Sequence, residues 1–266
     1  MKQKLTVYQV DAFTHELFKG NPAGVCLYEK ALDVTLMQNI ALEMNLSETA
    51  FVRKMGSNFE IRYFTPEVEV DLCGHATLSS AHIIFETGIV PKNKTISFKA
   101  KASDLSVKIE NGWIVMNFPQ YFLKKIEGIN AFKEITGINP LEIYECDRGW
   151  KIILVDNEEH IAKMNPNSEL LKQNNLGHIM VTAKSKKNGI DYVDRCFVPD
   201  VGIIEDPVTG SAQCGLGPYW KMKTGKTHFV CQQLSKRGGI LKIDVLDERI
   251  EIAGQAITVF KTEFSI

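Results

Sequence analysis

Alternating apolar and polar residues at the start of the chain predict β-strands. Leu5, Val7 and Val10 alternate with more polar residues, and residues 20–24, Gly-Asn-Pro-Ala-Gly, have the composition of a turn. A second apolar run follows at residues 25–27. Together these features predict a β-hairpin or meander.

The next segment changes from strand to helix periodicity. Asp33 is suited to cap a helix, and apolar residues recur at helical spacing from there to Met44. Apolar runs at residues 49–53 and 59–64 then predict two strands. Glu48 therefore falls at the junction between a predicted helix and a predicted strand.

The two halves of the chain share short motifs in the same order. R-x-F-x-P occurs at residues 62–66 and 195–199, and G-x-A follows at residues 74–76 and 210–212, opening a small-residue segment that ends in Thr-Gly. We interpret this as duplication of a whole domain, giving two related α+β halves with a cleft between them; coincidental similarity is the alternative. Strands are predicted after each Thr-Gly, at residues 95–100, 105–109, 239–243 and 249–252.

The segment between the halves, residues 126–175, is more polar and is predicted to be irregular. It contains a helix-like run at residues 131–135 and a turn signal, Asn-Pro-Asn, at residues 165–167. It carries no motif that points to chemistry.

The composition indicates a globular protein of the cytoplasm. The 266 residues carry 31 Lys and Arg against 32 Asp and Glu, a net charge of −1, and 44% are hydrophobic. This balance gives no general attraction to nucleic acid or anionic lipid. No apolar stretch approaches the roughly 18 residues of a membrane span, and the N-terminus lacks a signal-peptide pattern. We therefore expect a cytoplasmic protein that binds neither nucleic acid nor membrane.

The cysteines and histidines predict neither a disulfide framework nor a metal site. The six cysteines form no CxxC pair, HExxH and Walker motifs are absent, and the six histidines are scattered. We expect free thiols, no metal and no cofactor, with a small molecule as the binding partner.

Gly74 and Gly210 are candidates for binding a carboxylate. Each lies where a predicted extended segment turns into a helix, so backbone N–H groups and the positive helix end would point outward. Two such ends facing one cleft would hold a carboxylate. The alternative is that both glycines only permit close packing of helix on strand.

Glu48, His75 and Asp206 carry side chains that can transfer protons. Asp206 precedes Pro207 and could instead cap a helix. His75 could instead be a structural histidine, as we interpret His82 on the same helix face. Glu48 could instead be an exposed loop carboxylate. The residues alone leave these alternatives open.

Longer runs that cover nearly the whole chain carry a more specific signal. They are Asp-Ala-Phe-Thr at residues 11–14, Phe-Lys-Gly-Asn-Pro-Ala-Gly-Val at 18–25, Asn-Leu-Ser-Glu-Thr-Ala-Phe at 45–51, Phe-Thr-Pro at 64–66, Cys-Gly-His-Ala-Thr at 73–77 and Glu-Asp-Pro-Val-Thr-Gly-Ser-Ala at 205–212. In order and spacing this combination resembles the phenazine-biosynthesis PhzF-like isomerase family.

The resemblance implies an α+β fold of the diaminopimelate-epimerase type. Two pseudo-symmetric domains are expected, each with a mostly antiparallel sheet around a central helix, and with the active site between them. The N-terminal domain would comprise residues 1–117 with a C-terminal strand at about 256–266, and the C-terminal domain residues 118–255. A homodimer is expected from the same resemblance.

The resemblance also implies a cofactor-independent isomerase. By analogy with the conversion of trans-2,3-dihydro-3-hydroxyanthranilate, it would shift a proton between carbons of a small carboxylate, cyclic or amino-acid-like. Carried over to this chain, Glu48 would be the general acid/base, with His75 and Asp206 as catalytic partners. The expected substrate-binding residues are Cys73, Gly74, Thr209, Gly210 and Ser211.

Related epimerases and racemases use two opposed cysteines, one from each half. Here Cys73 occupies the first position but Thr209 occupies the second, and a hydroxyl does not serve as a thiolate base at neutral pH. An epimerase or racemase is therefore a less favoured alternative, and a catalytically silent carboxylate-binding homologue is another. A single Glu would have to act as base and acid, so we expect burial or the substrate carboxylate to raise the pKa of Glu48.

Overall fold

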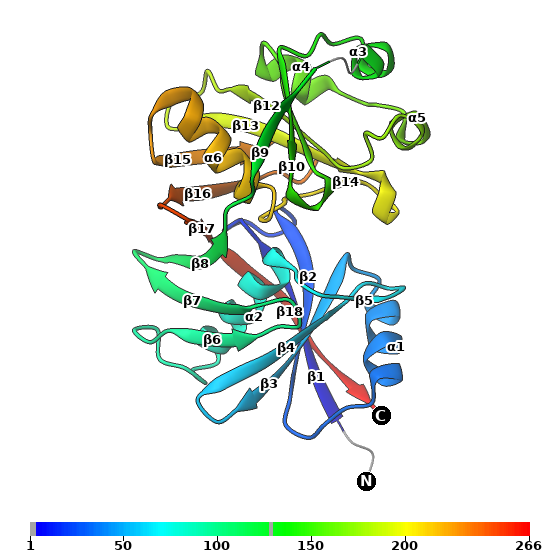
Figure 1. The fold of residues 1–266 in the computed structure, drawn as a ribbon. Helices are drawn as coiled ribbons and strands as arrows, with labels where there is room; N and C mark the ends of the chain where they lie inside the picture. Colours follow the sequence, from blue (N-terminus) through cyan, green and yellow to red (C-terminus); the bar gives the residue numbers. More distant parts are fainter. Residues whose placement is uncertain (1–3, 128–129) are drawn as a thin grey trace. The chain divides into compact units, whose positions relative to one another are not determined.

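The computed structural model describes residues 4–127 and 130–266 (Figure 1). The chain divides into two units. Unit 1 consists of two segments of the chain, up to residue 117 and residues 253–266. Unit 2 comprises residues 118–252. None of the helices in these described residues combines the length and the apolar character that crossing a bilayer requires.

Unit 1 contains two helices and a set of mainly antiparallel strands. The strand β8 leads out of unit 1, and β18 returns to it near the C-terminus. The elements are β1 (Lys4–Ala12), β2 (Asn21–Tyr28), α1 (Val34–Met44), β3 (Glu48–Met55), β4 (Asn58–Phe64), β5 (Glu69–Val70), α2 (Gly74–Glu86), β6 (Ile96–Lys99), β7 (Asp104–Glu110), β8 (Trp113–Pro119) and β18 (Ala256–Ser265).

The central helix of unit 1 is α2. It packs against β1, β2, β3 and β18, and Figure 1 shows it enclosed by the strands of the unit. Ten of its 13 residues are buried. The strands pair antiparallel except β2 with β3 and β4 with β6, and α1 and α2 make these two crossovers. As predicted, Asp33 caps α1 by accepting from the backbone N–H of Thr35.

Unit 2 has more helical segments than unit 1, and its strands are again mainly antiparallel. β17 leads back toward unit 1. The elements are β9 (Leu123–Ile126), α3 (Asn130–Thr136), β10 (Glu142–Cys146), the short 3-10 helix η1 (Asp147–Gly149), β11 (Lys151–Leu154), α4 (Glu158–Lys163), α5 (Ser168–Gln173), β12 (Ile179–Lys184), β13 (Tyr192–Val198), the 3-10 helix η2 (Pro199–Val201), β14 (Ile203–Asp206), α6 (Gln213–Thr224), β15 (His228–Gln233), β16 (Gly239–Val245) and β17 (Arg249–Gly254).

The strand pairing of unit 2 repeats that of unit 1. β11 and β12 are parallel like β2 and β3, and β13 and β15 are parallel like β4 and β6. β9 lies antiparallel on β10 as β18 lies on β1. The buried helix α6 takes the place of α2 between the parallel pair. This equivalence supports duplication of a whole domain.

Both R-x-F-x-P motifs form the same local structure. Arg62 in β4 pairs with Glu69 in β5 through two hydrogen bonds of 2.8 Å, and Arg195 in β13 pairs with Glu205 in β14 through bonds of 2.6 and 2.7 Å. Each guanidinium also lies over the phenylalanine two residues later, at 5.3 Å from the ring centroid in unit 1 and 4.9 Å in unit 2. The motif therefore encodes an ion pair that joins adjacent strands.

Two local predictions were wrong. Residues 21–24 do not form a turn but begin β2, where Pro22 lies opposite Asp11 in the antiparallel pair; among residues 20–24 only Gly20 has a positive φ. The described part of residues 126–175 is not irregular, because its short strands and helices place apolar residues in a core. These include Phe132, Ile143, Ile153, Ile161 and Leu171.

Candidate functional site

The first cluster of polar side chains lies in unit 1, where β2 and β3 begin and α2 starts. Glu48 is the first residue of β3 and pairs in parallel register with Ala23 of β2. His75 lies in the first turn of α2, and Cys73 is its N-cap residue. The Cys73 side chain makes no cap hydrogen bond to the helix, so its sulfur is available to neighbouring side chains. The structure therefore brings together Glu48, Cys73 and His75.

The His75 imidazole is the centre of this cluster. Its Nε2 lies 3.1 Å from Oε2 of Glu48 and 3.2 Å from Oγ of Ser47. Its Nδ1 lies 3.2 Å from Nδ2 of Asn21 and 3.4 Å from Sγ of Cys73. The Glu48 side chain is 17% exposed and that of His75 7%, so the contact is mostly shielded from water.

The contact between Glu48 and His75 is an ion pair in distance but not an aligned hydrogen bond. Oε2 of Glu48 is buried and has no hydrogen-bond partner among residues 4–127 and 130–266. A buried carboxylate oxygen without a partner carries a desolvation cost, which marks the position as a candidate for binding or chemistry.

The charges of the cluster are set by competition between burial and neighbouring groups. Burial works to raise the pKa of Glu48, but the positive charge and hydrogen-bonding capacity of His75, with help from Ser47 and Cys73, lower it below its usual value. Burial works to lower the pKa of His75, but Cys73 and Glu48 raise it well above its usual value. Burial and Glu48 raise the pKa of Cys73. A carboxylate, an imidazolium and a neutral thiol result at neutral pH.

The expected upward shift of the Glu48 pKa is therefore wrong for the chain without a bound molecule. The prediction considered burial and a substrate carboxylate but not the imidazole 3.1 Å away. Burial is the largest single influence on this pKa, but the charge and hydrogen-bonding capacity of His75, together with Ser47 and Cys73, outweigh it.

The second cluster lies in unit 2, between the end of β14 and the start of α6. The Thr209 hydroxyl donates to Oδ2 of Asp206 at 2.6 Å, and the Thr209 N–H donates to Oε1 of Gln233 at 2.8 Å. Nε2 of Gln233 donates to the backbone carbonyl of Asp206 at 2.7 Å. Gly210 and Ser211 continue this loop as a turn. One short segment, held by these hydrogen bonds, therefore contains Asp206, Thr209, Gly210 and Ser211.

Asp206 does not cap a helix. It is the last residue of β14, whereas α6 begins at Gln213 with Ala212 as its N-cap residue. The helix start is displaced because Gly210, Ser211 and Ala212 first form a tight turn, in which the Gly210 carbonyl accepts from the Gln213 N–H at 3.1 Å. The capping interpretation of Asp206 was therefore wrong.

The second cluster adjoins a buried carboxyl group, that of Asp194, whose register partner in the parallel pair of β13 and β15 is Gln233. Asp194 in β13 is 0% exposed, and burial raises its pKa to about 7. Cys196 and Gln213 oppose this increase, whereas the nearby charge of Asp206 adds to it. Oδ1 of Asp194 has no hydrogen-bond partner in the part of the chain that the structure describes.

Sequence reasoning missed four members of the two clusters. Asn21 and Ser47 lie within the family-like runs but carried no separate signal. Asp194 and Gln233 lie outside every motif, and they come together because they are register partners in the parallel pair of β13 and β15. Only the strand pairing reveals that contact.

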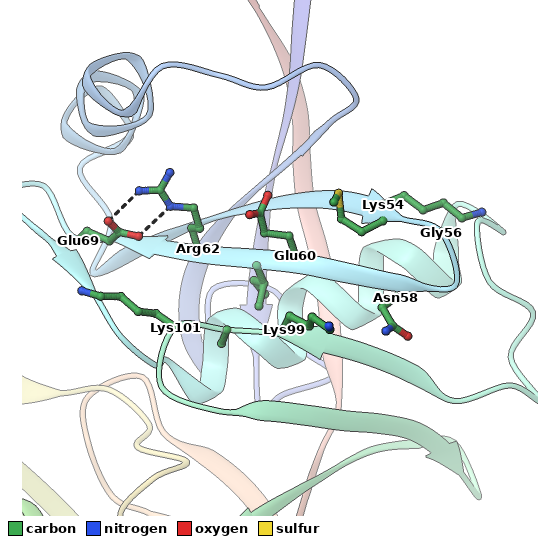
Figure 2. Close-up of a pocket in the computed structure, with 11 residues that line it drawn as sticks. Lys54, Gly56, Asn58, Glu60, Arg62, Glu69, Lys99 and Lys101 are labelled. Carbon is green, nitrogen blue, oxygen red and sulfur yellow. Dashed lines mark hydrogen bonds and ion pairs between the residues drawn. The ribbon is translucent and has the colours of Figure 1, made fainter.

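A separate groove on unit 1, with a volume of about 850 Å³, contains none of the predicted site residues. Figure 2 shows Lys99 and Lys101 along it, with the paired Arg62 and Glu69 at one end. Its second carboxylate, Glu60, pairs with Arg53 at 2.7 Å. Both carboxylates of this groove are thus held in ion pairs with arginine. The two clusters, and not this groove, are therefore the candidate functional site.

Known proteins resemble the chain over nearly its full length. Residues 10–262 match the family model of phenazine biosynthesis-like proteins. The chain is 45% identical to an uncharacterized isomerase of Halalkalibacterium halodurans over 97% of both chains. It is 36% identical to the phenazine biosynthesis-like domain-containing protein of Homo sapiens, over 97% of this chain and 98% of the human one.

Solved structures resemble the fold to different degrees. A phenazine biosynthesis protein of the PhzF family from Enterococcus faecalis superposes with a TM-score of 0.94 and 38% identity, covering 99% of this chain and 100% of that one. A hydroxyproline epimerase of Agrobacterium vitis, solved with trans-4-hydroxy-L-proline bound, gives a TM-score of 0.67 at 10% identity, covering 100% and 94%. The second likeness concerns the fold alone. The predicted α+β, epimerase-like fold class is confirmed.

Proposed function

This chain belongs to the phenazine biosynthesis-like family, and we propose that it is an isomerase that moves a proton between two carbons of a small carboxylate without a cofactor. Curated relatives that cover nearly the whole chain are named isomerases, which supports the reaction class. The substrate, cyclic or amino-acid-like, and the roles of individual residues are part of the proposal.

The single observation that carries the proposal is the buried contact of Glu48 with His75. A base that removes a proton from carbon must be ionised before the reaction, and the lowered pKa of Glu48 keeps it so at neutral pH. Its Oε2 is not held by a hydrogen bond within the described residues. This oxygen would take the proton from the first carbon and return it to the second on the same face.

His75 would keep the site electrically balanced during this transfer. Before the transfer its positive charge compensates the Glu48 carboxylate 3.1 Å away. When Glu48 is protonated, the negative charge has moved to the substrate, and the imidazolium would stabilise the delocalised anion. Asn21 lies at the opposite ring nitrogen, with its Nδ2 3.2 Å from Nδ1; because an imidazolium donates from both nitrogens, the amide would present its oxygen to Nδ1 to hold the ring in place.

The second cluster would supply substrate contacts. Thr209 holds the Asp206 carboxylate through a 2.6 Å hydrogen bond, which orients it for a hydrogen bond to a bound molecule. Ser211 and the backbone at Gly74 and Gly210 are proposed contacts to the substrate. That both clusters act on one substrate molecule stays a prediction, as does the homodimer.

A two-thiol epimerase receives less support. Burial and Glu48 raise the pKa of Cys73, so its thiol is protonated at neutral pH. At the second position the Thr209 hydroxyl already donates to Asp206.

Solvent-deuterium exchange tests the proposal. The protein in D2O is incubated with a panel of small carboxylates, cyclic and amino-acid-like, and incorporation of deuterium at carbon is followed by NMR. Glu48→Gln should lose the exchange by about 10²-fold or more, while Glu43→Gln, on the exposed side of α1, should retain it. Full exchange by Glu48→Gln would contradict the proposal. Ligands that raise the Tm without exchange would instead indicate a binding homologue.

A further inference from the structure

We infer that Glu48, Cys73 and His75 form an inhibitory binding site for a thiophilic divalent cation, with Zn²⁺ as the best match. One donor atom from each side chain lies within 4.8 Å of the other two. The sequence motifs gave no sign of such a site, because Glu48 is separate in the chain from the other two ligands and no metal-binding spacing is present.

Two of the three distances between the donor atoms are close to those of tetrahedral zinc. Bonds of about 2.0–2.1 Å to nitrogen and oxygen and about 2.3 Å to sulfur place neighbouring donors roughly 3.3–3.6 Å apart in a tetrahedron. Nε2 of His75 lies 3.1 Å from Oε2 of Glu48 and 3.9 Å from Sγ of Cys73. All three donor atoms lie within 4.8 Å of one another, so side-chain adjustments on the order of 1 Å bring them to one cation.

The unpartnered oxygen is a second, independent observation. Oε2 of Glu48 is buried, faces Nε2 of His75 and accepts no aligned hydrogen bond from the described residues. A cation between the two atoms would satisfy this oxygen. The Asn21 amide could turn to accept a hydrogen bond from Nδ1, which orients the ring as outer ligands of metal-bound histidines do.

The ligand types select the cation. Thiolate and imidazole favour Zn²⁺, whereas Mg²⁺ and Ca²⁺ require mainly oxygen ligands. One carboxylate and one thiolate balance the charge of a divalent ion. Two protons leave to solvent as the cation binds, one from the Cys73 thiol and one from Nε2 of the His75 imidazolium. Three protein ligands leave one position for water or for an anionic group of a bound molecule.

Binding of the cation would occupy the oxygen that the proposed reaction needs. Inhibition of proton transfer is thus the expected consequence, and this consequence rests on the proposed function. The metal site itself rests only on the geometry of the three ligands.

Co²⁺ binding to the reduced, full-length protein tests the inference. Co²⁺ is the spectroscopic probe, because a thiolate ligand gives a near-ultraviolet charge-transfer band and tetrahedral coordination gives strong visible bands. We expect one equivalent of Co²⁺ to produce both, one equivalent of Zn²⁺ to abolish them, and excess Mg²⁺ to leave them unchanged.

Matched variants assign the ligands. Cys73→Ser should abolish the charge-transfer band and His75→Asn should weaken Co²⁺ binding by at least the roughly 10–100-fold seen when outer ligands are changed. Cys146→Ser, which changes the half-buried cysteine of unit 2, should bind as the unchanged protein does. A Tm for each variant shows that it is folded. A band that persists in folded Cys73→Ser, or the absence of Co²⁺ binding, would overturn the inference.

The two proposals fail separately. Loss of exchange in Glu48→Gln without any Co²⁺ binding would leave the isomerase proposal standing and remove the metal site. Stoichiometric Co²⁺ binding that depends on Cys73, with full exchange in Glu48→Gln, would support the metal site and contradict the isomerase proposal.

Discussion

Arg195 donates to both carboxylate oxygens of Glu205, from Nε at 2.6 Å and from Nη2 at 2.7 Å. Its Nη1 also donates to the carbonyls of Ile161 and Met164, which end α4. The Arg195 side chain is 10% exposed. One buried guanidinium therefore joins β13, β14 and the end of a helix.

The Arg195 pair should contribute more to stability than its counterpart in unit 1. We expect Arg195→Met to lower the free energy of unfolding by about 3–5 kcal/mol, because it leaves the carboxylate of Glu205 and two carbonyls without their donor. Arg62→Met, at a more exposed pair, should cost about 1 kcal/mol. Urea unfolding of both variants gives the comparison, and equal losses would contradict it.

Asp194 should make the stability of the protein depend on pH. Burial raises its pKa to about 7 in the folded chain, against about 3.9 when unfolded. The folded state therefore binds the proton more tightly, and its stability falls as the pH rises from about 4 through 7. Each pKa unit corresponds to about 1.4 kcal/mol, so the total is on the order of a few kcal/mol.

Asp194→Asn removes this titration and tests the prediction. The stability advantage of the variant over the unchanged protein should be about 2–3 kcal/mol larger at pH 8 than at pH 5. Urea unfolding at both values measures the difference, with Asp104→Asn at the exposed start of β7 as the control. The same pH slope in Asp194→Asn and in the unchanged protein would show that Asp194 is not the source.

Gly24 allows β2 to approach β3 beside Glu48. A Cβ at this position would lie 2.6 Å from Oγ1 and 2.9 Å from Cγ2 of Thr49. We expect Gly24→Ala to destabilise the fold by about 1–3 kcal/mol. The double variant Gly24→Ala with Thr49→Ala should lose less than the sum of the single variants, because the smaller side chain relieves the contact. Strict additivity in urea unfolding would refute this account.

Asn21 is expected to be a positioning residue for the His75 ring. It is fully buried, and its amide lies 3.2 Å from Nδ1 of His75. Asn21→Ala should slow carbon-deuterium exchange by up to about 10²-fold, since the ring loses its orientation. Asn188→Ala, in an exposed turn, is the control. An unchanged exchange rate in folded Asn21→Ala would remove Asn21 from the site.

The sequence predicted those features that depend on local pattern or on repetition. α1 follows from the capping residue Asp33 and the helical spacing after it, and the structure has both. The repeated R-x-F-x-P motif indicated the duplication, which the equivalent strand pairing supports. His75 and Glu48 were singled out by the family-like runs, and they lie in contact.

Features that depend on register or on distance could not be predicted. Asp194 and Gln233 are 39 residues apart, as their numbers show, and meet only through the parallel pairing of β13 with β15. The direction of the Glu48 pKa depends on a 3.1 Å contact that no spacing in the sequence specifies. Pro22 was taken as part of a turn, because its place in an antiparallel pair becomes visible only with its partner Asp11.

Because β18 lies near the C-terminus, unit 1 completes its sheet later during synthesis than unit 2 is made. It lies along β1 from end to end, so unit 1 cannot complete its sheet until residues 256–265 have left the ribosome. Unit 2 is continuous in the chain and precedes that strand. Before β18 arrives, the nascent chain carries an unpaired edge at β1, and a polypeptide truncated there would present that edge to other molecules as a template for aggregation.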